Sequence, residues 1–188
     1  IQWGKTDSIL KVEDKDNVKR FCTVKLDNIK ISDSPKWMKN NLESYGIPSI
    51  NNVVDITNYV MVEYGIPMHA FDISKLKTQE NHPLLLVRKA DQGEEFETWQ
   101  GTKIKLSTQD TVVADAEKPV AIAGVIGGAN SDIDSNTKAI ILEAACYNQA
   151  AIRRTSIRHS IRTEASSRHE KFLNPKLVKD SILRAIYL

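Results

Sequence analysis

The segment 138–147, KAIILEAACY, constrains the fold of this chain more than any other stretch. Its apolar residues run almost without interruption, and one carboxylate, Glu143, lies among them. A short apolar run of this kind is typical of a buried strand. Because a buried strand needs other elements packed around it, the chain is expected to form a domain with a real hydrophobic core.

Periodicity places further strands and helices on both sides of this segment. Extended patterns favour strands, and apolar residues at helical spacing favour helices. The expected strands are 20–31, 84–90, a hairpin within 94–106 that turns at Gln100–Gly101, and two short strands within 111–128; the expected helices are 34–46, 51–65, 148–160 and 174–188. This order predicts a single compact α+β domain over residues 1–188, with a mixed or antiparallel β-sheet core and flanking helices.

Capping residues predict where helices begin. Ser34 is expected to be an N-cap, with Pro35 at the first position of the helix that follows. Asn174 and Pro175 are expected to occupy the same two positions of the last helix. Between the two C-terminal helices, residues 161–167 are expected to form a loop.

Composition limits the class of protein. Hydrophobic residues make up 41% and charged residues 27%, as in globular proteins, and no apolar run approaches the roughly 20 residues that span a bilayer. Cys22 and Cys146 belong to no C-x-x-C pair, so two reduced thiols of a cytosolic protein are expected. The chain begins without Met or a signal peptide, and we interpret it as a piece of a larger protein.

Two titratable side chains lie in apolar surroundings. A buried Glu143 needs a partner, either in a structural ion pair, for example with a C-terminal arginine, or in a ligand facing it in a pocket. A lone histidine such as His69, in GIPMHAFD, is more often a structural group than a ligand or base. Asp72 is placed to orient its ring if both lie on a helical turn. No third metal ligand is spaced nearby, and no G-x-S-x-G motif is present, so neither a metal site nor a serine triad is expected.

Two other segments have more than one interpretation. The glycine-rich segment 123–132, AGVIGGANSD, lacks the spacing of nucleotide-binding motifs, and is compatible with a binding wall or a bulged turn. From Gln149 to the end, nine Lys and Arg face three Asp and Glu. This basic end favours a polyanionic partner, and the alternative is a solvated helical face.

Three motifs in a fixed order identify a family resemblance. They are NNVVDITNYV (51–60), GIPMHAFD (65–72) and RTEASSRHE (162–170). Together with their surroundings they closely resemble the beta subunit of bacterial-type phenylalanine–tRNA synthetase, over roughly Arg20 to the end. The matching region of that subunit is its central editing module.

The resemblance implies that the module hydrolyses tyrosine wrongly attached to tRNA(Phe). In this assignment Glu143 and His69 recognise the tyrosine hydroxyl, Thr163 positions water or the ester, and His69 is also the candidate catalytic base. A site built to hydrogen-bond a hydroxyl can prefer it by about ten-thousandfold. The implied substrate pocket comprises Thr57, Asn58, His69, Gly124, Gly127, Glu143, Thr163 and Ala165, and small residues among them leave room for an aromatic ring. The implied tRNA contacts are Arg153, Arg154, Arg158, Arg162 and Arg168.

The resemblance also implies a parent enzyme in the cytoplasm. It would be a heterotetramer of two alpha and two beta subunits that uses ATP and magnesium, neither of which this chain is expected to hold. Pro48 and Phe172 depart from the family, which often has an arginine contacting the tRNA end and a glycine, respectively. Pro48 is the main argument for one alternative, a non-catalytic architectural and tRNA-binding module of the same subunit. A second alternative is a free-standing RNA-binding domain unrelated to synthetases.

Overall fold

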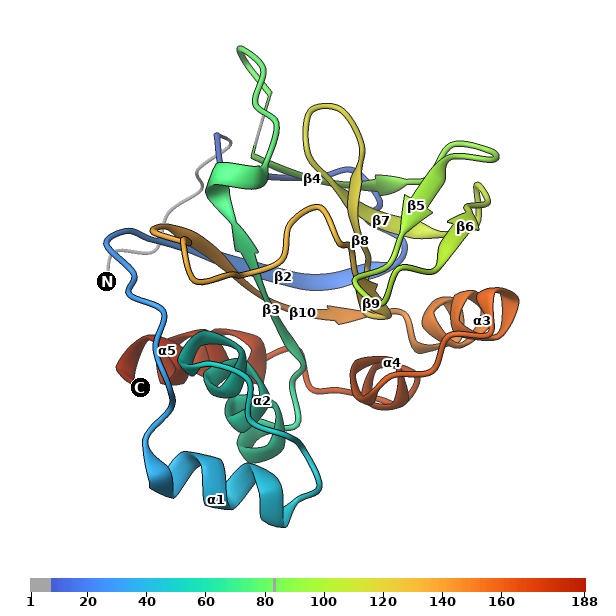
Figure 1. The fold of residues 1–188 in the computed structure, drawn as a ribbon. Helices are drawn as coiled ribbons and strands as arrows, with labels where there is room; N and C mark the ends of the chain where they lie inside the picture. The colour runs from blue at the N-terminus through green and yellow to red at the C-terminus, as the bar shows by residue number, and fades with distance from the viewer. Residues whose placement is uncertain (1–7, 83) are drawn as a thin grey trace.

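Residues 8–82 and 84–188, which the computed structural model describes, form three layers (Figure 1). The middle layer is a three-stranded antiparallel sheet in the order β2–β10–β3. A five-stranded sheet, β1–β4–β7–β8–β9, packs on one of its faces, and helices α2 and α5 cover the other. The predicted α+β class with a mixed or antiparallel sheet core is confirmed, since β1 and β4 are parallel and the other pairs are antiparallel.

The elements have the following bounds. The strands are β1 (Leu10–Val12), β2 (Val18–Leu26), β3 (Met68–Asp72), β4 (Leu85–Lys89), β5 (Glu95–Glu97), β6 (Lys103–Lys105), β7 (Thr111–Ala114), β8 (Pro119–Ile122), β9 (Ile126–Gly127) and β10 (Ile140–Tyr147). The helices are α1 (Lys36–Ser44), α2 (Asn52–Tyr64), α3 (Gln149–His159), α4 (Glu164–His169) and α5 (Leu177–Tyr187), with a 3-10 turn η1 (Ile73–Lys75). Within the described ranges, no helix has both the length and the apolar character that crossing a membrane requires.

Strand β10 is the centre of the molecule, and its predicted burial is confirmed along its whole length. Because side chains alternate along a strand, its even-numbered residues pack against the helices and its odd-numbered residues face the five-stranded sheet. Glu143 therefore points into the space between the two sheets, together with Ala145 and Tyr147. The fold thus buries the Glu143 carboxylate in the hydrophobic core between the two sheets.

The predicted hairpin within 94–106 is confirmed as the antiparallel pair β5–β6. It docks on the edge of the five-stranded sheet through an isolated bridge between Thr98 and Gly128, and the Trp99 amide donates to the Gly127 carbonyl. The two short strands within 111–128 are confirmed as β7 and β8, and a third short strand, β9, follows them.

The predicted N-cap at Ser34 is wrong. Helix α1 has Pro35 at its N-cap without a side-chain cap, because the Ser34 hydroxyl donates instead to Asp55 at 2.5 Å. The carboxylate of Asp55 is fully buried and also accepts from Ser49 and from the Ile50 amide. A buried carboxylate needs several donors, and this requirement takes Ser34 away from the helix.

The C-terminal helices also differ from their predicted bounds. The expected loop 161–167 is wrong for residues 164–167, which form the first part of α4. Thr163 starts this helix through a capping box, because Thr163 Oγ1 accepts from the Ser166 amide and Ser166 Oγ accepts from the Thr163 amide. The predicted N-cap at Asn174, with Pro175 at the first helical position, is also wrong: helix α5 begins at Leu177 with Lys176 as its N-cap, and Asn174 Oδ1 accepts from the Lys176 amide just before it.

Candidate functional site

Glu143 and His69 lie side by side on the middle sheet. Glu143 on β10 is directly opposite His69 on β3 and opposite Thr23 on β2. Directly opposite residues of antiparallel strands have Cβ atoms about 5 Å apart on one face. The sheet brings together in this way two residues that lie far apart in the sequence.

The predicted role of Asp72 in orienting His69 is wrong. Residues Met68–Asp72 of GIPMHAFD form strand β3 rather than a helical turn, so His69 and Asp72, three apart, point to opposite faces. The Asp72 carboxylate accepts instead from Ser74 and from the Thr137 hydroxyl. Asp72 therefore anchors the loop that leads into β10.

A cavity of about 70 Å³ lies over this pair of strands. Among the residues expected at the site, the structure brings five to its lining: His69, Gly124, Gly127, Glu143 and Ala165. The rest of the described lining is Pro67, Met68, residues 121–123, Val125, Ile126 and His169, so most lining residues are small or apolar and the titratable side chains among them are His69, Glu143 and His169. Neither Thr57 nor Asn58 of α2 belongs to this lining, and the Thr57 hydroxyl donates to the Val54 carbonyl.

The partner of Glu143 is a phenol of the same chain. The Tyr147 hydroxyl donates to Glu143 Oε1 at 2.7 Å, and Glu143 is only 7% exposed. Burial raises the pKa of Glu143 to about 7, although the hydrogen bond from Tyr147 lowers it in part. The alternative of an ion pair with a C-terminal arginine is wrong, because no salt bridge to Glu143 exists in the described part of the chain.

Two buried histidines at the cavity have unsatisfied ring nitrogens. Nε2 of His69 and Nδ1 of His169 are buried and have no hydrogen-bond partner among the described residues. Burial lowers the pKa of His69 to about 4 and that of His169 to about 3, so both rings are neutral at pH 7. A buried polar atom without a partner costs about 1–3 kcal/mol, and a polar ligand that pairs with it recovers that free energy.

Sequence reasoning missed Tyr147 and His169. The signal for Tyr147 is the two-residue period of β10, which places it on the face of Glu143. The signal for His169 depends on recognising α4, where Ala165 and His169 are four residues apart and hence on one side of the helix. The rings of Tyr147 and His169 meet edge to face with centroids 5.0 Å apart.

The space beside the two expected glycines is filled by side chains of the protein itself. A Cβ at Gly127 would lie 2.6 Å from His69 Cε1. A Cβ at Gly124 would lie 2.8 Å from Tyr147 Cδ2 and 2.9 Å from Ile152 Cδ1. In this conformation the glycines let resident rings approach the backbone, rather than leave an open space for a second aromatic ring.

This close packing predicts a large cost for Gly124→Ala. Gly124 has φ +67° and Gly65, at the end of α2, has φ +76°, so alanine is strained at both. Only Gly124 also has atoms within 3 Å of the new Cβ, while nothing lies within 4 Å at Gly65. We expect Gly65→Ala to lower the free energy of unfolding by about 1 kcal/mol and Gly124→Ala by about 3 kcal/mol. Urea denaturation of both variants measures the difference; equal losses would contradict the packing seen around Gly124.

Thr163 lies beside the cavity and is committed to local structure. Its hydroxyl donates to the Val125 carbonyl at 2.7 Å and accepts from the Ser166 amide at 3.0 Å. Val125, its acceptor, and Ala165, two residues along the chain, both line the cavity. A hydroxyl has one donor and two acceptor positions, so one acceptor position of Thr163 is left over.

Three of the five expected tRNA-binding arginines have acidic partners. Arg158 pairs with the fully buried Asp110, Arg162 with Glu170, and Arg168 with Glu164. Arg153 and Arg154 on α3 are exposed, and the described residues include no ion-pair partner for either. The basic stretch is thus divided between arginines in internal ion pairs and the exposed Arg153 and Arg154, of which Arg153 lies close enough to Glu170 to lower the pKa of that carboxyl.

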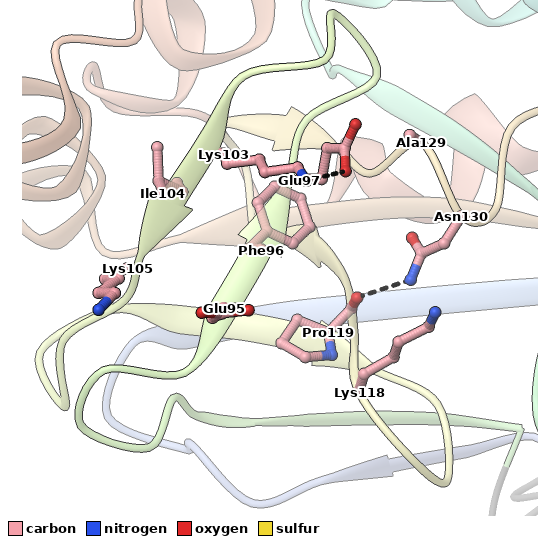
Figure 2. Close-up of a pocket in the computed structure, with 10 residues that line it drawn as sticks. All are labelled: Glu95, Phe96, Glu97, Lys103, Ile104, Lys105, Lys118, Pro119, Ala129 and Asn130. Carbon is pink, nitrogen blue, oxygen red and sulfur yellow. Dashed lines mark hydrogen bonds and ion pairs between the residues drawn. The ribbon is translucent and has the colours of Figure 1, made fainter.

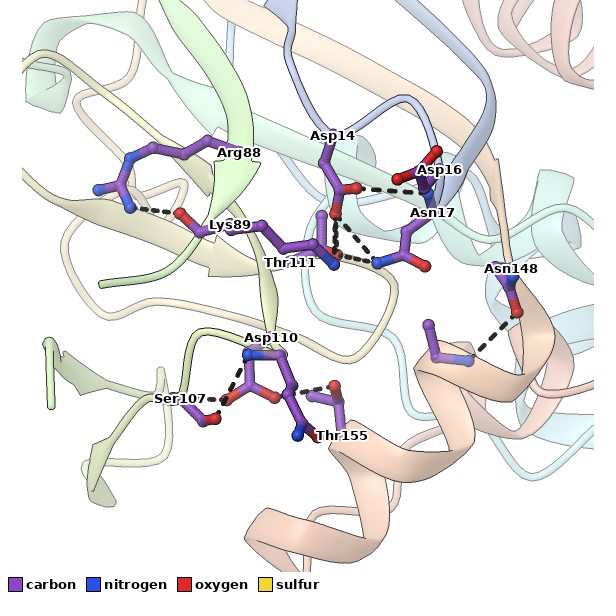
Figure 3. Close-up of polar contacts among 12 residues, drawn as sticks. Asp14, Asp16, Asn17, Arg88, Lys89, Ser107, Asp110, Thr111, Asn148 and Thr155 are labelled. Atoms are coloured by element: carbon purple, nitrogen blue, oxygen red, sulfur yellow. Dashed lines mark hydrogen bonds and ion pairs between the residues drawn. The ribbon is translucent and has the colours of Figure 1, made fainter. Parts of the chain in front are cut away.

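Asp110 keeps the Arg158 side chain in an internal ion pair. Its carboxylate also accepts from Thr155 and the Ser107 amide (Figure 3). It accepts from His159 as well, and so fastens α3 to the five-stranded sheet. Burial raises the pKa of Asp110, but the hydrogen bonds from His159, Ser107 and Thr155 outweigh it, and the net pKa lies below its usual value. The Asp110 cluster is therefore a structural anchor.

A larger hollow of about 510 Å³ lies between the β5–β6 hairpin and the loops around β8 and β9 (Figure 2). Lys103 and Glu97 face each other across the hairpin at 4.0 Å, and Asn130 Nδ2 donates to the Pro119 carbonyl. Ala129 and Asn130 of the glycine-rich segment line this hollow, but none of the residues expected in the substrate pocket does. The smaller cavity at Glu143 is therefore the candidate site.

Known proteins resemble this chain in sequence over nearly its full length. The profile described as the B3/4 domain matches residues 17–188. The phenylalanine–tRNA ligase beta subunit of Carboxydothermus hydrogenoformans is 38% identical over 94% of this chain, and that of Streptococcus pyogenes serotype M3 is 45% identical over 89%. These matches cover 22% and 20% of the relatives, so the chain spans about a fifth of their length.

A solved structure supports the same fold. An N-terminal fragment of the phenylalanyl-tRNA synthetase beta subunit from Pyrococcus horikoshii matches 87% of this chain and 50% of its own, with a TM-score of 0.54 and 11% sequence identity. At that identity the likeness concerns the fold alone. The chain belongs to the B3/4 domain family, and its resemblance to the beta subunit of phenylalanine–tRNA synthetase is confirmed along nearly its whole length.

Proposed function

We propose that the cavity at Glu143 is a hydrolytic editing site, which removes tyrosine from mischarged tRNA(Phe) within the beta subunit of phenylalanine–tRNA synthetase. The observation that carries the proposal is the unpaired, buried Nε2 of His69 directly across the sheet from Glu143. Both groups line the cavity, among residues that are mostly small or apolar. A tyrosine hydroxyl would pair with them, whereas phenylalanine would leave them unpaired, and this difference is the basis of strong discrimination.

Each polar group has a distinct role in this proposal. Glu143 accepts a hydrogen bond from the phenolic hydroxyl, and the neutral ring of His69 donates a second hydrogen bond from Nε2 to the phenolic oxygen. Thr163, beside the lining, uses its remaining acceptor position to hold water or the ester. Thr57 and Asn58 make no direct contact with the tyrosine, because they lie outside the lining.

Orientation supplies most of the rate in this mechanism. An aminoacyl ester is already activated, so holding it against a water molecule lowers the barrier without a protein nucleophile. The neutral ring of His69 can accept a proton, but its low pKa of about 4 makes it a weak general base at pH 7. We therefore assign His69 chiefly to recognition.

The cavity must widen to admit tyrosine. An engineered cavity of about 150 Å³ binds benzene, and the volume here is only about 70 Å³. The small volume also favours the alternative, a non-catalytic architectural or tRNA-binding module with the same fold. The parent enzyme would supply ATP, magnesium and the alpha subunit in either case.

Deacylation separates the two functions. The full synthetase would be incubated with Tyr-tRNA(Phe) and, separately, with Phe-tRNA(Phe). Editing predicts fast hydrolysis of the tyrosyl ester and slow hydrolysis of the phenylalanyl ester. Equal, slow hydrolysis of both would favour the architectural module.

Arg153 and Arg154 are the proposed tRNA contacts of the basic stretch. Replacing both with alanine in the full synthetase is expected to weaken tRNA(Phe) binding, and to reduce the slope of log affinity against log salt by about 1 for each phosphate that is no longer neutralised. Arg162→Ala is the matched control, because its guanidinium is already paired with Glu170 and its removal should leave the slope unchanged. Filter binding at several salt concentrations measures both. An unchanged slope in the double variant would place the RNA elsewhere.

A further inference from the structure

We infer that Tyr147 is a positioning residue of the cavity: its hydroxyl holds one oxygen of the Glu143 carboxylate and leaves the other oxygen for the hydroxyl of a bound tyrosine. The inference rests on the proposed editing function and adds a residue that neither the motifs nor the expected pocket contains. The hydrogen bond from the Tyr147 hydroxyl to Glu143 Oε1 is 2.7 Å long. No hydrogen bond to Oε2 occurs within the described residues, so that oxygen has capacity for a ligand.

The geometry of β10 makes this contact specific. Glu143 and Tyr147 are four residues apart on one face of the strand, so their Cα atoms are separated by about 13 Å. The residue between them on that face is Ala145, whose methyl group is small enough for the two long side chains to meet above it. The carboxylate is therefore drawn along the strand by a partner at a fixed distance.

The ring of Tyr147 is held in place on several sides. It packs edge to face against His169 and against Phe21, with ring centroids 5.0 Å and 6.3 Å apart. Its Cδ2 atom lies against the backbone of Gly124, where no Cβ would fit. Because the residue is 6% exposed and closely packed, its hydroxyl is a fixed donor rather than a mobile one.

A fixed donor orders the carboxylate before the ligand arrives. Without Tyr147, the two oxygens of Glu143 would be equivalent and the side chain free to rotate in the cavity. With it, a bound tyrosine meets a carboxylate that already has one oxygen satisfied, next to the unpaired Nε2 of His69. Preorganised acceptors of this kind discriminate better than mobile ones, because binding does not have to order them.

The titratable groups that face Glu143 are few. His69 faces it from β3, His169 from α4 and Tyr147 from β10 itself. Thr23 on β2 and the lining residues of β8 and β9 carry no titratable group. Both histidines stay neutral, so the ionisation of Glu143 near pH 7 dominates the local charge, and the hydrogen bond from Tyr147 favours the ionised form.

The test is Tyr147→Phe in the full synthetase, which removes only the hydroxyl. We expect kcat/KM for Tyr-tRNA(Phe) hydrolysis to fall about tenfold, hydrolysis of Phe-tRNA(Phe) to stay the same, and the pH midpoint of tyrosine selectivity to move upward. A Tyr→Phe control at Tyr64, part-buried against the helical core and away from the cavity, should change none of these values.

The outcomes separate this inference from the proposed function. A folded Tyr147→Phe variant with unchanged selectivity and pH midpoint would mean that Tyr147 only packs the core. Increased selectivity would mean that its hydroxyl competes with the substrate, and it would also overturn the inference. If the wild-type enzyme itself shows no tyrosine selectivity, the editing function fails; carbon-13 NMR titration of the Glu143 carboxyl in both proteins then tests the positioning alone, and an unchanged pKa would overturn it.

Discussion

Replacing Glu143 with alanine in the full synthetase is expected to lower kcat/KM for Tyr-tRNA(Phe) hydrolysis by about 100-fold at pH 8, while hydrolysis of Phe-tRNA(Phe) changes little. At this pH the carboxyl, with a pKa of about 7, is mostly ionised. A hydrogen bond to a charged group contributes about 1.5–3 kcal/mol, and every 1.4 kcal/mol corresponds to a factor of about ten. Loss of the acceptor removes this contribution for tyrosine and has no counterpart for phenylalanine.

Two further variants refine the Glu143 result. Glu143→Gln keeps an oxygen that can accept from Tyr147, so it separates loss of charge from loss of the cavity wall, and we expect a loss of about tenfold. Glu94→Gln is the matched control, because Glu94 is also largely buried and pairs with Arg88 away from the cavity. If Glu94→Gln and Glu143→Gln impaired tyrosine hydrolysis equally, the carboxylate at 143 would have no special role in recognition.

The sequence predicted the central strand and five of the residues that line the cavity. It did not predict which side chains fill the space inside the cavity. The apolar run of β10 and the motif around His69 each indicated a buried position, and their pairing across the sheet follows once both are strands. The helical interpretation of GIPMHAFD failed because so short a segment does not distinguish a turn from a strand, and it produced the wrong partner for Asp72. The family resemblance implied one pocket for both groups, and the sheet register is what places them side by side.

The side chains that pack beside Gly124 and Gly127 could not be predicted from the sequence, for a different reason. The small residues Gly124 and Gly127 have two possible uses, room for a ligand or close contact with a neighbouring ring, and sequence does not distinguish them. The structure assigns the space to Tyr147, Ile152 and His69, which come from distant segments. Likewise, the charge pattern of the C-terminal stretch did not indicate that Asp110 would bind Arg158 across 48 positions.

The buried histidines and Glu143 predict how stability changes with pH. Between about pH 4.5 and 6.5, unfolding lets His69 and His169 take up protons, since their pKa values rise from about 4 and about 3 to the normal 6.5. Their contribution to stability is present above pH 6.5 and is lost as pH falls. Glu143 acts in the opposite direction, because its pKa is about 7 when folded and 4.5 in the unfolded chain, so its contribution is present below pH 4.5 and is lost as pH rises towards 7.

Between about pH 4.5 and 6.5 the unfolded chain therefore binds one more proton than the folded chain. Each variant should change this difference by one proton, and with it the pH dependence of stability. The free energy of unfolding of the wild-type chain should rise by about 1.4 kcal/mol per pH unit between about pH 4.5 and 6.5. Glu143→Gln removes the opposing group and should double that slope, whereas His169→Phe removes one histidine and should bring it close to zero. Urea denaturation across this range measures the slopes, and comparison with the wild type cancels the surface groups that titrate in all three proteins. Identical slopes would mean that these side chains are not buried in solution, and that water reaches the cavity at Glu143.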